Sequence, residues 1–253
     1  MADVSILVRC FERNEFTDHT LASIEATATS NYELICSPNR ASAPINSNLL
    51  INKAQCERVI LLDDDIAFLS RGWDERLLET LARYPKMGCV SPRIADVEGR
   101  LLGPYRYVRD DCVVTGFETW GAVLAFQRGV IRYDEAYERT LCDDTDFLLQ
   151  HLQAGYLLGI DGAVNVVHLR ELSRQADPPW LAKNIEYFAK KWQMASHQVA
   201  WGEYTEWRSP DDCTVGLVQA LAAHVELWHG DESAILNAGD PEADAALDEA
   251  RAE

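Results

Sequence analysis

Basic residues are scarce in this sequence, and long apolar segments are absent. Only 23 of the 253 residues are Lys or Arg, against 41 Asp or Glu, so the formal net charge is −18. Such a charge repels a phosphate backbone, and we therefore expect no general nucleic-acid binding. No apolar run approaches the length of about 18 residues that a membrane helix needs, and the first residues form no basic and apolar leader. These absences predict a cytoplasmic protein without membrane insertion.

Closely spaced cysteine pairs are missing as well. The seven cysteines are scattered without a C-x-x-C pair, and several lie in apolar, strand-like stretches. We therefore expect free thiols in the core, as in a reducing cytosol. With 47% hydrophobic residues, the chain can form one large α/β core, or a core plus a small appendage, rather than two full domains.

The first hundred residues alternate apolar runs, typical of strands, with helical patterns. We expect strands at 4–9, 33–36, 58–62 and 88–92, and helices at 17–28, 49–54 and 70–82. Thr17 is the expected N-cap of the first helix, and residues 37–47 are predicted to form a loop. This succession predicts an α/β fold of Rossmann-like type, with a mixed, mostly parallel sheet flanked by helices.

The second half is organised differently. The expected elements are strands at 122–127, 156–160 and 164–168, and helices at 144–154 and from 178 onward. Residues 96–118 are polar and hard to assign. The predicted division is a main domain over 1–195, a helical C-terminal extension packed on it over 196–229, and a flexible acidic tail over 230–253.

Three consecutive carboxylates, Asp63, Asp64 and Asp65, end the apolar strand predicted at 58–62. The carboxyl ends of strands are where an α/β protein keeps its ligands. Asp63 and Asp65 are two residues apart, so they share one face of an extended segment and can approach the same ion. Buried like charges need a counter-cation, which favours a divalent metal that carries a phosphorylated substrate; a solvated acidic turn is the alternative.

A second acidic group, Asp143 and Asp144, opens the helix predicted at 144–154. These carboxylates either complement the helix dipole or supply a general base on a rigid support. Trp120 and Gly121 precede the strand at 122–127, where the indole either packs in the core or contacts the apolar face of a sugar ring.

The order and spacing of these motifs resemble the family 2 glycosyltransferases of GT-A fold. The series consists of Asn48, Asp63-x-Asp65, Trp120-Gly121, Tyr133-Asp134-Glu135, Asp143-Asp144-x-Asp146 and the strand-terminal His168. Within the family, the set is most similar to the galactofuranosyltransferase branch. The resemblance covers residues 3–195, so it implies a GT-A domain over 1–195. Each motif alone is unspecific, and it is the shared register that carries the resemblance.

The resemblance implies a metal-dependent, inverting hexosyl- or pentosyltransferase. Such an enzyme moves a sugar from a nucleotide-diphosphate donor, here expected to be UDP-linked, to a hydroxyl acceptor on a glycan, a protein or a modified base in DNA. The implied cofactor is Mn²⁺ or Mg²⁺, which would stabilise the leaving diphosphate. Asp65 is the implied direct metal ligand, Asp63 a metal or ribose contact, and His168 a nitrogen ligand.

The other roles follow from the same resemblance. Asp144 is the implied catalytic base, and Asp143, Trp120 and Gly121 are implied contacts of the acceptor or the sugar. Asp64 is an implied contact of a donor-sugar hydroxyl. Donor binding is further assigned to Phe11, Arg13 and Asn48.

The first motif departs from the family pattern. Residues 9–13 read Arg-Cys-Phe-Glu-Arg instead of the usual Pro-x-Tyr-Asn, and residues 36–38 read Cys-Ser-Pro where an acid is expected. A degenerate family member that binds nucleotide or glycan without turnover is therefore an open alternative. A sugar nucleotidylyltransferase is disfavoured, because the Gly-rich loop that would bind the triphosphate after the first strand is missing.

Overall fold

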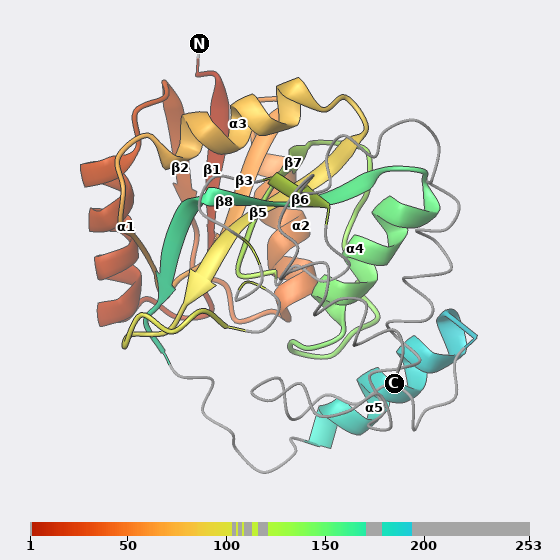
Figure 1. Cartoon of the computed structure of the whole chain (residues 1–253). Coiled ribbons are helices and arrows are strands. Elements are labelled where there is room, and N and C mark those ends of the chain that lie inside the picture. The colour runs from red at the N-terminus through yellow and green to blue at the C-terminus, as the bar shows by residue number, and fades with distance from the viewer. Residues whose placement is uncertain are drawn as a thin grey trace.

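The computed structural model describes residues 2–102, 105, 108, 113–115, 121–170 and 179–193 (Figure 1). Its centre is one eight-stranded mixed sheet, in which seven strands follow the order β2-β1-β3-β7-β5-β8-β4 and β6 pairs with β8. The strands are β1 Val4–Arg9, β2 Tyr32–Cys36, β3 Arg58–Asp63, β4 Ile66–Phe68, β5 Met87–Ala95, β6 Val113–Thr115, β7 Val123–Gln127 and β8 Leu157–His168. The predicted α/β architecture is confirmed.

Strand direction sets where the polar strand ends meet. Strands β2, β1 and β3 are parallel neighbours, with Arg9 opposite Asp63 at the carboxyl ends of β1 and β3. Strand β7 runs antiparallel between β3 and β5, while β5 and β8 are parallel. Strand β4 returns antiparallel on β8 and pairs Ile66 with His168. Both the triplet at 63–65 and His168 therefore lie at one region of the sheet.

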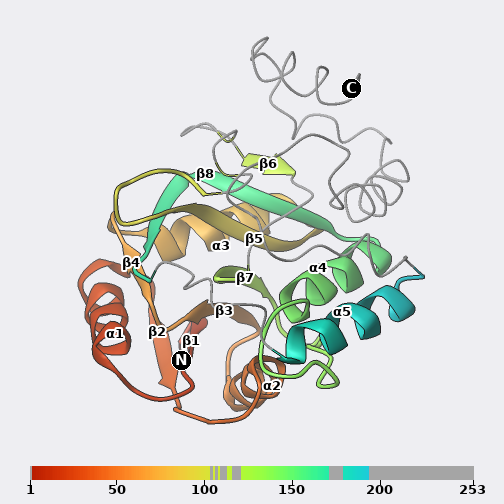
Figure 2. The same ribbon diagram turned by 90° about the horizontal axis from the view of Figure 1, so that it is seen from below.

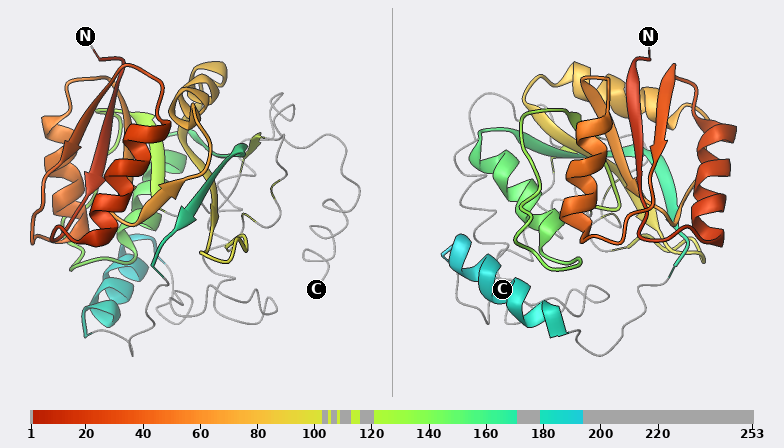
Figure 3. Two further views of the ribbon diagram at one scale, coloured as in Figure 1. Left: turned by 90° about the vertical axis from the view of Figure 1, so that its left-hand side faces the viewer. Right: turned by 180° about the vertical axis from the view of Figure 1, so that it is seen from behind.

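In the described part of the chain, five helices cover the two faces of the sheet (Figures 2 and 3). They are α1 Glu15–Thr27, α2 Ala43–Lys53, α3 Trp73–Arg83, α4 Asp143–Gln153 and α5 Pro179–Lys191. Alternate residues of β1 separate two cores: Ile6 and Val8 pack with α1 and α3, whereas Leu7 packs with α2, α4 and α5. This alternation is the period-two pattern of a strand that is covered on both faces.

The first helix begins earlier than the sequence pattern predicts. Helix α1 starts at Glu15, and its N-cap is Asn14 rather than Thr17. The Asn14 side chain accepts hydrogen bonds from the backbone amides of Phe16 and Thr17, at 2.9 and 3.1 Å, and Thr17 Oγ1 accepts one from the Asn14 amide. Both residues thus form a reciprocal capping box, in which Thr17 is the third helical residue.

Two other predictions of element bounds were wrong. Helix α2 starts at Ala43, inside the predicted loop at 37–47, and its buried face carries Asn46, Ser47 and Asn48, so no apolar periodicity marks its first turns. The two strands predicted at 156–160 and 164–168 are one strand, β8. Its register against β5 shifts between the pairs 92–161 and 93–165, so the polar interruption there is a bulge instead of a turn.

Five cysteines lie in the described part of the chain. Cys10, Cys36, Cys56, Cys89 and Cys142 all have free thiols, and all but Cys36 are buried, as predicted. Within the described residues no helix combines the length and apolarity needed to cross a membrane. The predicted extension at 196–229 and tail at 230–253 lie outside the described residues.

Candidate active site

The acidic triplet sits at the sheet edge where β3 ends. Asp63 is the last residue of β3, Asp64 and Asp65 form the tight turn, and β4 begins at Ile66. The pairing of Ile66 with His168 brings the end of β8 beside this turn, and the amide of Leu169 donates to the carbonyl of Asp65 at 2.7 Å. Backbone hydrogen bonds therefore fix the acidic residues relative to His168.

One group of side chains at this edge can hold a metal ion. Asp63, Asp65 and His168, hereafter the metal group, each place one ligand atom within 4.8 Å of the others. His168 Nε2 lies 3.6 Å from Asp65 Oδ1, a buried oxygen without a hydrogen-bond partner among the described residues. Two carboxylates and an imidazole suit Mn²⁺ and are compatible with Mg²⁺. The three residues implied by the sequence as ligands thus come together.

The second nitrogen of His168 fixes the tautomer of the ring. His168 Nδ1 lies 2.7 Å from the backbone carbonyl of Arg170. A carbonyl only accepts, so Nδ1 carries the proton and donates, which leaves Nε2 with the lone pair that a metal requires.

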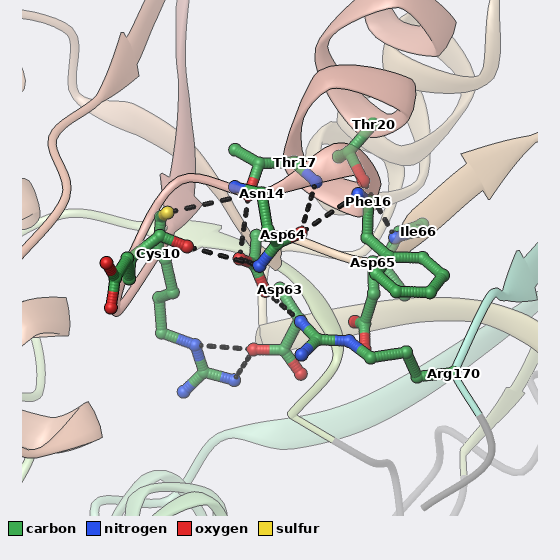
Figure 4. Close-up of polar contacts among 12 residues, drawn as sticks. Cys10, Asn14, Phe16, Thr17, Thr20, Asp63, Asp64, Asp65, Ile66 and Arg170 are labelled. Carbon is green, nitrogen blue, oxygen red and sulfur yellow. Dashed lines mark hydrogen bonds and ion pairs between the residues drawn. The ribbon is translucent and has the colours of Figure 1, made fainter.

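The carboxylate of Asp64, between Asp63 and Asp65 in the sequence, is directed toward α1. Asp64 accepts a hydrogen bond from Thr17 Oγ1 at 2.9 Å and lies close to Asn14 at the start of α1 (Figure 4). Asp64 lies in the turn with its side chain directed toward the start of α1, whereas the side chain of Asp65 lies beside His168. Asp64 ties the turn to α1, and its contact with a donor sugar stays a prediction.

Arg170 lies over the triplet and was not among the predicted residues. Its Nε donates to Asp65 Oδ2 at 2.9 Å and its Nη2 to Asp64 Oδ1 at 2.7 Å, while the guanidinium covers the ring of Phe16 (Figure 4). It supplies positive charge to two carboxylates. The only signal in the sequence is a basic residue two positions after the strand-terminal His168.

The second acidic group opens α4, and its two carboxylates differ in exposure. The side chain of Asp144 is 29% exposed and accepts from Arg9 Nη1 at 2.9 Å through Oδ1. Asp143 is fully buried, and neither carboxylate oxygen has a partner among the described residues. Burial, reinforced by the charge of Asp144, raises the pKa of Asp143 well above its ordinary value. Of the pair, Asp144 is the one that a solvent-borne substrate can reach.

Arg9 joins the two acidic groups. Its Nε and Nη2 contact Asp63 Oδ1 at 2.9 and 2.7 Å, and its Nη2 also donates to the carbonyl of Gly121 at 2.8 Å. Burial disfavours its charge, but the carboxylates of Asp144 and Asp63 outweigh this and raise the pKa of Arg9. Burial also disfavours the charge of Asp63, and it raises the pKa of this carboxyl to about 6, although the Arg9 charge opposes that rise. The sequence marks Arg9 only as a departure from the family motif.

Gly121 lies against the Asp144 carboxylate, and this position leaves no room for a side chain. A Cβ at this position would lie 1.9 Å from Asp144 Cγ and 2.2 Å from each carboxylate oxygen. A side chain there and the observed position of Asp144 are therefore incompatible. The neighbouring Trp120 lies outside the described residues, so its sugar contact stays a prediction.

The loop that leads into α4 has an unusual backbone. Arg139, Leu141 and Cys142 all have positive φ, at 59, 77 and 69°. Non-glycine residues pay for this conformation with strain of about 1–3 kcal/mol each, so other contacts must hold it.

Helix α5 supplies those contacts. The buried Asn184 donates from Nδ2 to the carbonyls of Glu138, Thr140 and Leu141, at 2.8 to 3.1 Å, and its Oδ1 accepts from the Glu138 amide at 2.9 Å.

One turn into α4, the buried Asp146 accepts from four side chains: Tyr137, Gln150, Lys191 and Trp192. Lys191 and Trp192, at the end of α5, thus hold the first turn of α4 through Asp146.

The predicted donor-binding residues outside the triplet differ in accessibility. Phe11 is 44% exposed, with the Arg139 guanidinium 5.4 Å from its ring centre, and Arg13 is exposed in an ion pair with Asp18. Both can meet a ligand. Asn48 is buried, and its amide bonds to the backbone of Tyr133 and to Glu135. In this structure Asn48 fixes the segment 133–135, and its donor contact stays a prediction.

No protein-family model matches this sequence, and no curated protein matches it by sequence. Solved structures match it by fold. GalNAc-T7, crystallised with UDP, GalNAc and Mn²⁺, is similar with a TM-score of 0.57 over 88% of this chain at 14% identity. The chain spans about half the length of that protein, 54%. TarS 1-349 of S. aureus is similar with a TM-score of 0.54 at 12% identity, over 78% of this chain and 68% of the other. The GT-A fold predicted from the sequence is confirmed.

Proposed function

We propose that this protein is a metal-dependent, inverting glycosyltransferase that moves a sugar from a nucleotide-diphosphate donor to a hydroxyl acceptor. One observation carries the proposal: Arg9 bridges Asp63 of the metal group, which can hold a divalent cation, and Asp144, an accessible carboxylate at a helix start. Displacement at an anomeric carbon with inversion needs both a leaving-group side and a base side.

The residues divide these tasks. Asp63, Asp65 and His168 would hold Mn²⁺ or Mg²⁺, which supplies positive charge for the departing diphosphate when bound. Asp144 keeps one oxygen on Arg9, and its other oxygen takes the proton of the acceptor hydroxyl. The N-terminus of α4 and the Arg9 guanidinium both place positive charge beside the Asp144 carboxylate.

The donor is proposed to be a UDP-sugar. The fold is shared with GalNAc-T7, whose structure holds UDP, GalNAc and Mn²⁺. The motif order resembles that of the family 2 enzymes, in particular the galactofuranosyltransferase branch. Phe11 and Arg13 are exposed just after β1 and can meet the nucleotide. A hexose and a pentose are both compatible. The acceptor is a hydroxyl on a glycan, a protein or a modified base.

Turnover of UDP-sugars with Mn²⁺ tests the proposal. We expect wild-type protein to release UDP slowly by donor hydrolysis, and faster once a suitable acceptor is added. Anomeric analysis of the product by NMR should show inversion. A retained configuration would remove Asp144 from the role of base, and absence of UDP release from a panel of UDP-hexoses and UDP-pentoses would contradict the proposed activity.

A binding protein without turnover is the second candidate. Two observations favour it. Arg9, in the altered first motif, occupies one oxygen of the proposed base, and Arg170, after β8, contacts two residues of the triplet. Such a protein would bind UDP with Mn²⁺ in calorimetry and release no UDP from a bound UDP-sugar. Any Mn²⁺-dependent hydrolysis that Asp65→Ala abolishes would exclude it.

A further inference from the structure

Arg9 is the buried cation of the site, and its contacts are too many for a simple ion pair. Its side chain is 7% exposed. Besides its bonds to Asp63, Asp144 and the Gly121 carbonyl, Nη1 lies 3.5 Å from Ser47 Oγ, and the guanidinium lies 5.9 Å from the ring centre of Tyr133. All three guanidinium nitrogens are thus engaged from several elements.

The geometry of these contacts requires a guanidinium. Nε and Nη2 both contact Asp63, whereas Nη1 contacts Asp144, which lies 135 residues further along the chain. A planar fork can hold two carboxylates at fixed angles, whereas the ammonium of Lys is a single point of charge. Arg9 therefore sets the orientation of Asp144 as well as its charge balance.

The positive charge of Arg9 attracts Asp144, but it repels a cation bound by the metal group. A bound divalent cation would contact Asp63, so it would lie close to a guanidinium that is buried from solvent screening. Like charges at short range in a buried site repel each other, and this repulsion weakens metal binding. The same residue is attractive to the base and repulsive to the metal.

We propose that Arg9 is a positioning residue that holds Asp144 ready for the acceptor while lowering the affinity of the site for its metal. The inference rests on the proposed function for the role of Asp144. It has one unusual consequence: loss of the Arg9 charge strengthens metal binding and weakens turnover. A residue that only supported the fold would weaken both together.

Two variants separate charge from geometry. Arg9→Met removes the charge and keeps an unbranched apolar stem, so we expect Mn²⁺ to bind about tenfold more tightly, while kcat falls about 100-fold because the base is misplaced. Arg9→Lys keeps the charge without the fork. It should bind Mn²⁺ with wild-type affinity, while its kcat falls about tenfold or more and the KM for the donor changes little.

Arg76→Met is the matched control. Arg76, on α3, also pairs with a buried carboxylate, that of Asp161 at 2.8 Å, and it belongs to neither acidic group of the site. Its loss should lower thermal stability and leave Mn²⁺ affinity and kcat unchanged. Circular dichroism and thermal unfolding of each variant verify folding. If Arg9→Met does not fold, Arg9→Gln, which also removes the charge, replaces it in the metal titration, while Arg9→Lys tests the positioning role.

Calorimetric or electron paramagnetic resonance titration with Mn²⁺ in the absence of donor gives the metal affinity without any turnover. Tighter Mn²⁺ binding by Arg9→Met with reduced kcat supports the inference. Weaker Mn²⁺ binding by Arg9→Met, or wild-type kcat in Arg9→Lys, overturns it. Wild-type protein that turns over no donor overturns the proposed function and the positioning role with it, whereas the titration still decides the effect of Arg9 on the metal.

Discussion

The metal group and the base group, Asp143 and Asp144, are held by different kinds of structure. Backbone pairing fixes the metal group, because Asp63 ends β3 and His168 lies opposite Ile66 in the β4–β8 ladder. The base group follows a loop with three positive φ values, which the side chain of Asn184 holds from α5. Ladder hydrogen bonds do not depend on side-chain identity, whereas the loop depends on a few side chains. We therefore expect the base group to be the more easily disturbed.

Asp144→Asn should give the largest difference between the effect on turnover and the effect on metal binding. An amide cannot take the acceptor proton, so we expect kcat to fall about 10³- to 10⁴-fold. Mn²⁺ affinity, measured by calorimetry, should change far less than kcat, because Asp144 supplies no atom to the metal group and Arg9 lies between Asp144 and Asp63. Full transferase activity in this variant would show that another residue is the base.

Asp65→Ala disrupts the metal group. It removes a buried carboxylate of the metal group whose Oδ1 has no hydrogen-bond partner among the described residues, and we expect Mn²⁺ affinity to fall about 100-fold or more. Binding of UDP that depends on Mn²⁺ should be lost in the same titration. Metal binding equal to wild type would place the ion elsewhere.

Gly121→Ala tests how tightly the base group is confined. A Cβ at this position overlaps the Asp144 carboxylate, so the carboxylate must move, and a shift of about 1 Å can cost about 100-fold in turnover. Mn²⁺ affinity should not change. Gly99→Ala is the control, since a Cβ at Gly99 meets no atom within 4 Å and any effect there comes from its φ of +80° alone. Equal loss of activity in both variants would argue against the steric account.

Asn184→Ala should give the smallest effect and act only on the base group. It leaves the loop carbonyls that Asn184 binds without their buried donor, which we expect to cost about 1–3 kcal/mol of stability. Turnover should fall by about tenfold as the loop relaxes, with Mn²⁺ affinity unchanged. Lys183→Ala on the same helix is the control, because its exposed ion pair with Glu138 contributes about 1 kcal/mol or less. A parallel loss of metal binding in Asn184→Ala would show that the two groups are not independent.

Much of the site follows from local patterns. Apolar runs place most of the strands, and the acidic residues after the strand at 58–62 suggest a metal site, to which only the family resemblance adds His168. The helix start at Asp143 is likewise visible. The helix bounds are less so: α2 begins at Ala43 because polar residues fill its buried face, and Asn14 rather than Thr17 caps α1.

The contacts between distant segments have no local signal. Arg9 reads as an altered motif, Arg170 as a basic residue after a strand, and Asn184 as a polar position in an amphipathic helix. Each becomes informative only when a partner from another element lies at its side chain. Asp64 is a further example. Its place in the triplet suggests a ligand contact, but in the structure its carboxylate accepts hydrogen bonds from Thr17 and Arg170.

The sequence by itself determined the α/β class, the places of β1, β2, β3, β5 and β7 along the chain and the residue types at the strand ends, because periodicity and turn chemistry act over a few residues. Tertiary structure alone decided which charges meet. Arg9 and Asp144 become neighbours because β1 and α4 pack at the same sheet edge, and the direction of a side chain across packed elements depends on backbone positions that no local pattern contains.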